Sequence, residues 1–122
     1  MRLLVFDPES MIQHFFKLEC EESRDECFSA SNLSEYRYYI DDLNPDMLIF
    51  GFEIFEQEQS EWLAWWSKYE KLDTQIPVAF YGSQAQKERY ESYNFNGLYF
   101  ILKPFVHKET ISRIKSLGNT KN

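Results

Sequence analysis

Five short strand-like segments that alternate with helical ones constrain the fold of this chain more than any other feature. Continuous apolar runs, such as residues 3–6 and 47–52, are typical of strands buried on both faces of a sheet. The predicted strands span residues 3–6, 25–30, 47–52, 78–81 and 98–102. The predicted helices span residues 9–21, 32–43, 57–72, 83–92 and 107–117.

This alternation predicts an α/β fold with right-handed crossovers and a parallel sheet that helices cover on both faces. We expect a flavodoxin-like (βα)5 three-layer sandwich with the strand order 2-1-3-4-5. In that order the first, third and fourth strands meet at a topological switch point. Any functional site is therefore expected beside the strand ends at Phe6, Phe50 and Tyr81.

The third predicted helix is rich in tryptophan. Its inner stripe is expected to contain Trp62, Leu63, Trp66 and Tyr69. Trp65 lies about 100° around the helix from Trp66, so the three tryptophans cannot all point inward. An exposed tryptophan would suit a contact with a partner protein, and partial burial of that side chain under a loop is an equally good alternative.

The length of 122 residues fits one domain. We expect this domain to span residues 1–117, with residues 118–122 as a tail or the start of a linker. The formal net charge of −7 argues against nucleic acid or an anionic membrane as a partner. No apolar run is long enough to span a membrane and no signal peptide is recognisable, which predicts a cytoplasmic protein.

Cys20 and Cys27 are the two cysteines of the chain. They lack CxxC spacing, and no nearby histidine completes a set of metal ligands. We therefore expect two reduced, partly buried thiols and no metal ion or cofactor. The chain also lacks a GxSxG elbow, a P-loop and an HExxH motif, so it is not expected to be an enzyme.

Two stretches of the chain, residues 44–51 and 98–105, resemble the receiver domain of two-component response regulators. The first reads Asn-Pro-Asp-Met-Leu-Ile-Phe-Gly and the second contains Lys103-Pro104. In that family the first stretch ends in the aspartate that accepts a phosphoryl group, and the lysine pairs with the phosphoryl oxygens. The resemblance covers nearly the whole chain and implies a flavodoxin-like fold with a role in signalling.

The resemblance places two of the family's three acidic positions on residues that have no carboxylate. Its two cation-binding acids fall on Asp7 and Pro8, and its phosphoacceptor falls on Gly51. Phosphoryl transfer to a carboxylate needs that carboxylate and a hard cation with several oxygen ligands. The chain therefore resembles a degenerate pseudo-receiver that lacks the phosphoacceptor aspartate.

The remaining positions of this degenerate pocket follow from the same resemblance. The family's Ser or Thr falls on Gly82, or on Ser83 in a register shifted by one residue. Lys103 keeps its identity and is expected to form an ion pair with Asp7 in the vacated pocket. Glu53 lies two residues after Gly51, so a continuing strand would direct its charge toward the same pocket.

A candidate partner surface surrounds the fourth helix and the fifth strand. Receivers commonly dimerise or bind partners through their fourth-helix, fifth-strand and fifth-helix face, and the family's switch aromatic falls on Phe100. Aromatic and basic side chains on this face suit an interface, and they equally suit a short mobile helix on a monomer. The candidate residues are Tyr90, Tyr93, Phe95, Tyr99, Lys108 and Arg113.

Two functions follow from these observations. The first is a pseudo-receiver that is never phosphorylated and acts as a protein–protein interaction module in a bacterial regulatory pathway, including as a homodimer. The second is a ligand-responsive switch that binds a small molecule or an anion in the vacated pocket. Neither function uses nucleic acid or a membrane as the partner of this domain.

Overall fold

The computed structural model describes residues 1–32, 44–69, 76–95, 98–103 and 109–119. Its five strands are Arg2–Phe6 (β1), Glu26–Ala30 (β2), Met47–Gly51 (β3), Val78–Gly82 (β4) and Leu98–Leu102 (β5). Its helices are Ser10–Glu22 (α1), Phe52–Gln57 (α3), Gln59–Tyr69 (α4), Gln84–Ser92 (α5) and Glu109–Asn119 (α6).

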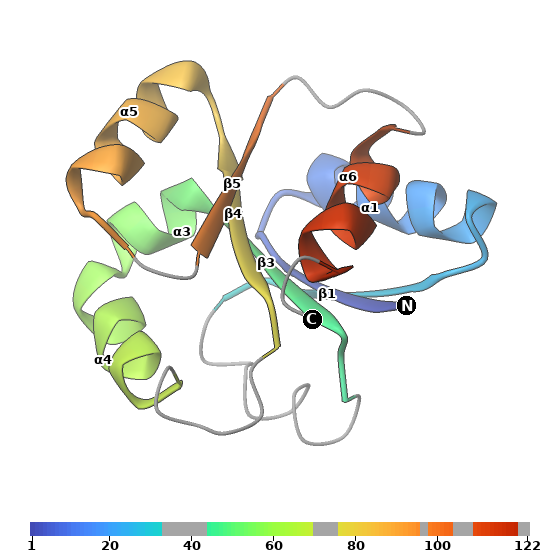
Figure 1. Cartoon of the computed structure of the whole chain (residues 1–122), viewed down its shortest axis with the longest axis horizontal. Helices are drawn as coiled ribbons and strands as arrows, with labels where there is room; N and C mark the ends of the chain where they lie inside the picture. Colours follow the sequence, from blue (N-terminus) through green and yellow to red (C-terminus); the bar gives the residue numbers. More distant parts are fainter. Residues whose placement is uncertain (33–43, 70–75, 96–97, 104–108, 120–122) are drawn as a thin grey trace.

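The sheet is parallel and has the strand order β2-β1-β3-β4-β5, which confirms the predicted flavodoxin-like topology. Helices α1 and α6 lie on one side of the sheet and α3, α4 and α5 lie on the other (Figure 1). In this order the carboxyl ends of β1, β3 and β4 lie next to one another. The register pairs Phe6 with Phe50 and Gly51 with Tyr81.

Side chains along each strand alternate between two cores, as the period of two in a β-strand requires. The core under α1 and α6 holds Leu3, Val5, Met47, Ile49 and Ala79 together with helical residues such as Phe16 and Ile114. The core under α3 and α4 holds Leu4, Phe6, Leu48, Phe50 and Phe80 together with Phe52 and Trp62. Because both faces are covered, the central strands are apolar without interruption.

The core on the α3, α4 and α5 side consists largely of aromatic rings, in a chain of which 18% of the residues are aromatic. The fully buried Trp62 lies at its centre, with its ring centroid 4.9 Å from that of Phe80 and 5.3 Å from that of Phe55. Edge-to-face and tilted ring pairs of this kind contribute about 0.5–1.5 kcal/mol each beyond their area burial. Trp65 and Trp66 are half-buried and pack against the same cluster.

The segment after β3 differs from its prediction. The strand ends at Gly51, and Phe52 already begins the short helix α3, so the strand predicted to reach residue 52 is one residue too long. The single helix predicted for 57–72 is preceded by α3 and begins as α4 at Gln59. Leu63, expected on the inner stripe, is 37% exposed. Phe52 and Phe55 on α3 occupy part of the core that the longer helix was expected to fill.

The other boundaries lie close to their predictions. Residues 33–43 lie outside the described residues, so the second predicted helix stays a prediction. Helix α6 begins at Glu109 and ends at Asn119, so two residues of the predicted tail 118–122 belong to it. The start of a linker there stays a prediction. Within the described residues, no helix has the length and apolar character needed to cross a membrane.

Candidate functional site

The candidate site lies at the carboxyl ends of β1, β3, β4 and β5. Asp7 follows β1, Gly51 ends β3, Gly82 ends β4 and Lys103 follows β5. The Asp7 N–H donates to the carbonyl of Ala30 at 2.9 Å, and the Lys103 N–H donates to the carbonyl of Gly82 at 2.8 Å. The structure therefore brings these four predicted site positions to one edge of the sheet.

The space beside Gly51 is filled by two neighbouring side chains. A Cβ atom built on Gly51 would lie 2.7 Å from Asp7 Oδ2 and 2.9 Å from the Tyr81 hydroxyl oxygen. Real Cβ atoms essentially never make contacts this short. Tyr81 is 2% exposed and Asp7 is 7% exposed, so neither side chain swings freely in solvent. The expectation that the missing side chain leaves a vacated pocket is therefore wrong at this position.

Asp7 is committed to the start of α1. Its Oδ1 accepts a hydrogen bond of 2.7 Å from the Glu9 N–H, and its carbonyl accepts one of 2.5 Å from Gln13 Nε2. Glu9 is the N-cap residue of α1 and makes no side-chain cap hydrogen bond, so Asp7 holds the residue from which the helix starts. Burial is the largest effect on the pKa of Asp7 and raises it, while the Glu9 N–H and the charge of Lys103 oppose that rise.

Lys103 does not form the predicted ion pair with Asp7. Its Nζ lies 5.2 Å from the centroid of the Tyr81 ring, which is a cation–π contact. Within the part of the chain that the structure describes, the charged groups of Lys103 and Asp7 do not come within ion-pair distance. Tyr81 thus contributes its hydroxyl to the space beside Gly51 and its ring to the lysine.

The receiver resemblance implies a divalent cation, and the residues present do not fit one. Pro8 and Gly51 have no oxygen-bearing side chains, and one oxygen of Asp7 is taken by the Glu9 N–H. A hard cation such as Mg²⁺ needs several oxygen ligands in a regular geometry. Over the described ranges of the chain, no three His, Cys, Asp or Glu side chains form a group that could hold a metal ion.

Gly82 and Ser83 are both used to start α5. Ser83 is the N-cap: its Oγ accepts from the Gln86 N–H at 3.2 Å, and Gln86 Oε1 accepts from the Ser83 N–H at 2.8 Å. This is a reciprocal capping box. A Cβ atom on Gly82 would collide with the side chain of Gln86. The Ser83 hydroxyl oxygen therefore accepts the hydrogen bond that caps α5.

Glu53 does not lie on the strand, so its predicted direction is wrong. It is exposed in the first turn of α3, where an acid is favoured by the helix dipole. Gln57 Nε2 donates to Glu53 Oε1 at 3.3 Å, one turn along the same helix. Its charge reaches the site only as the smallest of the effects that raise the pKa of Asp7.

The candidate partner residues fall into two groups, one on each face of β5. Tyr90 is half-buried, its hydroxyl donates to the carbonyl of Leu98 at 3.0 Å, and burial raises its pKa. Its ring packs against that of Phe100 at 5.1 Å, which places the predicted switch aromatic in the aromatic core. Tyr99 packs against the opposite core, beneath α1 and α6.

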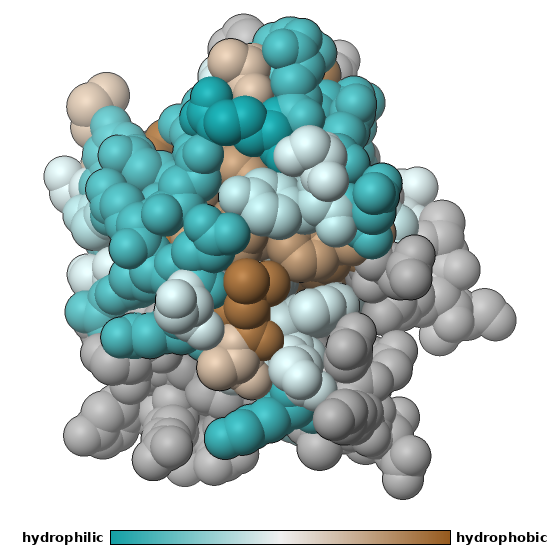
Figure 2. All heavy atoms as spheres, turned by 90° about the vertical axis from the view of Figure 1, so that its left-hand side faces the viewer, coloured by the Kyte–Doolittle hydropathy of each residue, from teal (hydrophilic) through white to brown (hydrophobic). Residues whose placement is uncertain are grey.

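The exposed members of the candidate surface are fewer than predicted. Tyr93 is 39% exposed, its ring packs on Phe55 and Phe95, and Arg113 is exposed on α6. Figure 2 shows the side of the molecule that carries α3, α4 and α5, where hydrophobic atoms lie between polar ones. Lys108 lies outside the described residues. Tyr93 is thus the most accessible aromatic of the predicted set.

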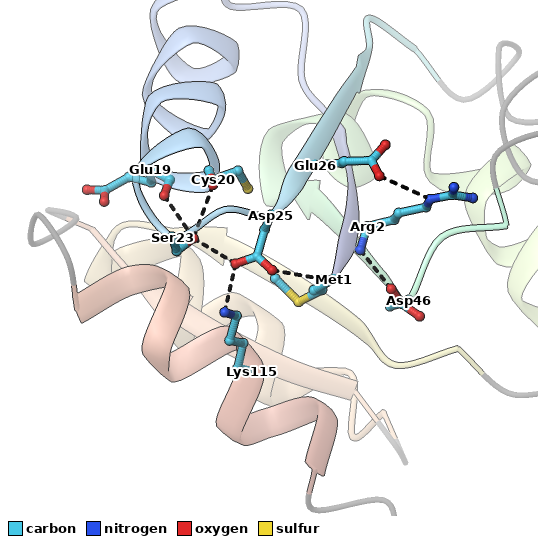
Figure 3. Close-up of polar contacts among 9 residues, drawn as sticks. All are labelled: Met1, Arg2, Glu19, Cys20, Ser23, Asp25, Glu26, Asp46 and Lys115. Carbon is cyan, nitrogen blue, oxygen red and sulfur yellow. Dashed lines mark hydrogen bonds and ion pairs between the residues drawn. The ribbon is translucent and has the colours of Figure 1, made fainter.

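A second polar cluster, which the sequence did not reveal, surrounds Asp25 (Figure 3). Asp25 Oδ1 lies 2.8 Å from the Met1 ammonium group, and Oδ2 lies 2.7 Å from both Lys115 Nζ and Ser23 Oγ. Burial raises the pKa of Asp25, but the hydrogen bonds from Lys115, Met1 and Ser23 outweigh it and lower the pKa to about 2. This carboxylate joins α6 to the turn between α1 and β2.

No protein-family model matches the chain. The virulence transcriptional regulatory protein PhoP of Salmonella typhimurium is 21% identical over 118 residues, which are 96% of this chain and 51% of that protein. The chain thus spans about half the length of the curated relatives it matches.

Solved structures of receiver proteins superpose on nearly the whole chain. A response regulator receiver modulated diguanylate cyclase from Pelobacter carbinolicus superposes with a TM-score of 0.70 and 22% identity, covering 99% of this chain and 94% of that one. The non-phosphorylated HemR receiver domain from Leptospira biflexa superposes with a TM-score of 0.71 and 21% identity, covering 96% and 93%. The fold is that of a receiver domain. The sequence resemblance to response regulators is likewise supported along nearly the whole chain.

The sequence correctly predicted that these site positions meet at the carboxyl ends of the strands, but it did not identify Tyr81 as part of the site. That residue was recognised only as a strand end, although its position directly before Gly82 sets it beside Gly51 in the sheet register. Tyr81 is the residue whose hydroxyl and ring organise the site. The signal that identifies it is the pairing of β3 with β4.

A substitution at position 51 tests the filled site. We expect Gly51→Ala to reduce the free energy of unfolding by about 1–3 kcal/mol, because the new methyl group overpacks against Asp7 and Tyr81. Tyr81→Phe removes one of the two clashing atoms, so the Gly51→Ala cost should shrink by about 0.5 kcal/mol or more in that background. Urea unfolding of the four proteins measures the coupling. Strictly additive effects would contradict the proposed contact.

The Asp25 cluster predicts a loss of stability in acid. Because the pKa of Asp25 is about 2 in the folded chain and 3.8 is its ordinary value, its contribution is complete above pH 4 and is lost as pH falls toward 2. Allowing for solvent at the partly exposed Lys115, we expect about 1–2 kcal/mol. Urea unfolding at about four pH values between pH 6 and pH 2.5 measures this contribution to the free energy of unfolding. An Asp25→Asn variant should show a correspondingly smaller decline, and an identical decline would contradict the assignment.

Proposed function

We propose that the chain is a pseudo-receiver: a receiver-like signalling module that binds a protein partner and is not phosphorylated. The observation that carries this proposal is the filled space beside Gly51. At the position of the family's phosphoacceptor there is no side chain, and the Asp7 carboxylate and the Tyr81 hydroxyl occupy the place where one would project. The fold and the resemblance to response regulators support a role in two-component signalling.

The electrostatics of the site support the same proposal. A phosphoryl group carries about −1.5 to −2 charge at neutral pH and needs cations to balance it. Beside Gly51 lies the buried carboxylate of Asp7, which would repel a phosphoryl group. The Lys103 ammonium group lies over the Tyr81 ring. Among the described residues, no three His, Cys, Asp or Glu side chains form a group that could hold a metal cation to balance the negative charge of Asp7. These charges therefore support signalling through contact with a protein partner.

The ligand-responsive switch has less support. It depends on open space beside Gly51 and Gly82 that an anion or a small molecule would enter. The Asp7 carboxylate and Tyr81 hydroxyl fill the space at Gly51, and the Gln86 side chain fills the space at Gly82. No observation in the described residues favours this second function over the first.

Incubation with acetyl phosphate and Mg²⁺ tests the proposal directly. We expect intact-mass spectrometry to show no added phosphoryl group, because Gly51 offers no nucleophile. A receiver domain that has its phosphoacceptor aspartate serves as the positive control in the same buffer. Addition of one phosphoryl group to this chain, mapped to any carboxylate at the edge of the sheet, would refute the proposal.

Partner capture tests the interaction role. We expect Tyr93→Ala to lower recovery of the cognate protein partner about tenfold or more, because exposed aromatic anchors often dominate an interface. Met11→Ala is the matched control, since Met11 is also highly exposed but lies on α1 across the sheet. Circular dichroism confirms that both variants fold. Equal recovery with both variants would exclude the Tyr93 surface as the interface.

A further inference from the structure

Part of the tryptophan-rich helix α4 reaches the surface beside the end of α5. Leu63 is 37% exposed and Trp66 is half-buried, and their spacing of three residues makes them neighbours on the helix surface. Tyr93, the C-cap residue of α5, is 39% exposed, and Phe95 is half-buried. We call these four side chains the apolar row. They offer accessible apolar atoms on the side of the sheet that carries α3, α4 and α5 (Figure 1).

Ring contacts connect the apolar row from α5 to α4. The Tyr93 ring stacks on that of Phe95, with a centroid distance of 5.6 Å and an interplanar angle of 19°. The fully buried Trp62 joins the two ends, because its ring lies 5.7 Å from that of Phe95 and 5.6 Å from that of Trp66. Packed neighbours restrict the rotamers of the exposed rings, so less side-chain entropy is lost when a partner binds. Hydrophobic atoms reach the surface on this side of the molecule (Figure 2).

The α4 end of the apolar row carries excess negative charge. Residues 52–69, which span α3 and α4, contain four glutamates and one lysine, a net formal charge of −3. Glu58 and Glu61 stand at the start of α4, and the Glu58 carbonyl accepts a hydrogen bond of 2.9 Å from the Trp62 N–H. Over the described part of the chain, neither Glu58 nor Glu61 forms an ion pair.

The cations of α5 do not cancel this charge, because each has an acidic partner. Arg89, four residues before Tyr93, donates two hydrogen bonds of 2.6 and 2.9 Å to the carboxylate of Glu56. Lys87 Nζ lies 3.9 Å from Glu91 Oε1. The apolar row therefore combines accessible aromatic rings with a negative border.

We propose that the apolar row binds a basic segment of the partner protein, with arginine or lysine side chains lying against its rings and facing Glu58 and Glu61. This inference rests on the proposed function, because it names the chemistry of the partner that the module binds. The face of an aromatic ring attracts a guanidinium or ammonium group within about 6 Å of its centroid. Complementary charge also speeds association and rejects partners of the wrong sign. An acidic segment would meet repulsion at the two glutamates.

The apolar row differs from the candidate partner surface that the sequence predicted. It shares Tyr93 and Phe95 with that surface and adds Leu63 and Trp66 of α4. Arg113 of α6 is not part of it, because α6 lies on the other side of the sheet (Figure 1). The tryptophan-rich helix therefore contributes to the partner contact as well as to the core.

Amide NMR with a basic peptide tests this inference on the folded full chain. The probe is a five-residue peptide, acetyl-Gly-Arg-Leu-Arg-Gly-amide, and the reference is the same peptide with citrulline in place of both arginines. We expect saturable shifts centred on the amides of Leu63, Trp66, Tyr93 and Phe95. The citrulline peptide should bind about fivefold more weakly or worse, because citrulline keeps the shape of arginine and lacks its charge.

Two double variants separate a local site from general attraction to an acidic chain. Glu58→Gln with Glu61→Gln should weaken binding of the arginine peptide about threefold or more, because it removes the negative border of the apolar row. Glu21→Gln with Glu22→Gln removes the same charge from the exposed end of α1 and should change the affinity by less than about twofold. Circular dichroism confirms that both variants fold.

Three results would overturn the inference: equal weakening by the two double variants, equal affinity for the two peptides, or no shifts at the apolar row. These results leave the proposed function standing, because it is tested by phosphoryl uptake and by partner capture with Tyr93→Ala. Uptake of a phosphoryl group would in turn refute the proposed function without changing where the arginine peptide binds.

Discussion

The close approach of Asp7 and Tyr81 to Gly51 is the constraint on which the functional end of this molecule depends. The buried Asp7 carboxylate and the buried Tyr81 hydroxyl lie where any side chain at position 51 would project. Glycine is the residue that fits between them without a shift of the neighbours. A phosphoacceptor aspartate at this position would require both neighbours to move.

The groups that resemble the receiver's catalytic set have acquired structural contacts. Asp7 accepts a hydrogen bond from the N–H of Glu9 just before α1, Ser83 caps α5, and Lys103 lies over the Tyr81 ring. Each of these contacts gives a polar or charged group of the site a partner within the fold. The receiver fold is therefore compatible with structural roles for all three groups.

The strand order was predictable because long-range topology follows from local patterns. Apolar runs at 3–6 and 47–52 mark buried strands, and the alternation with helices leaves few parallel arrangements. The break at Phe52 was missed because an apolar residue that follows a buried strand fits strand and helix alike. The Asp7–Lys103 ion pair was wrong because the Tyr81 ring lies against Lys103, and its position depends on the β3–β4 register. The Asp25 cluster joins residues 1, 25 and 115, which no local pattern connects.

Titration with Mg²⁺ and beryllium fluoride, followed by amide NMR, tests the central claim most directly, because this mixture imitates an acyl phosphate on a receiver aspartate. We predict no shift of the Asp7, Gly51, Tyr81 and Lys103 amides at concentrations that saturate a phosphorylatable receiver. Saturable shifts centred on Asp7 and Gly51, with Mg²⁺ required, would show that the edge of the sheet opens and binds a metal, and would contradict this account.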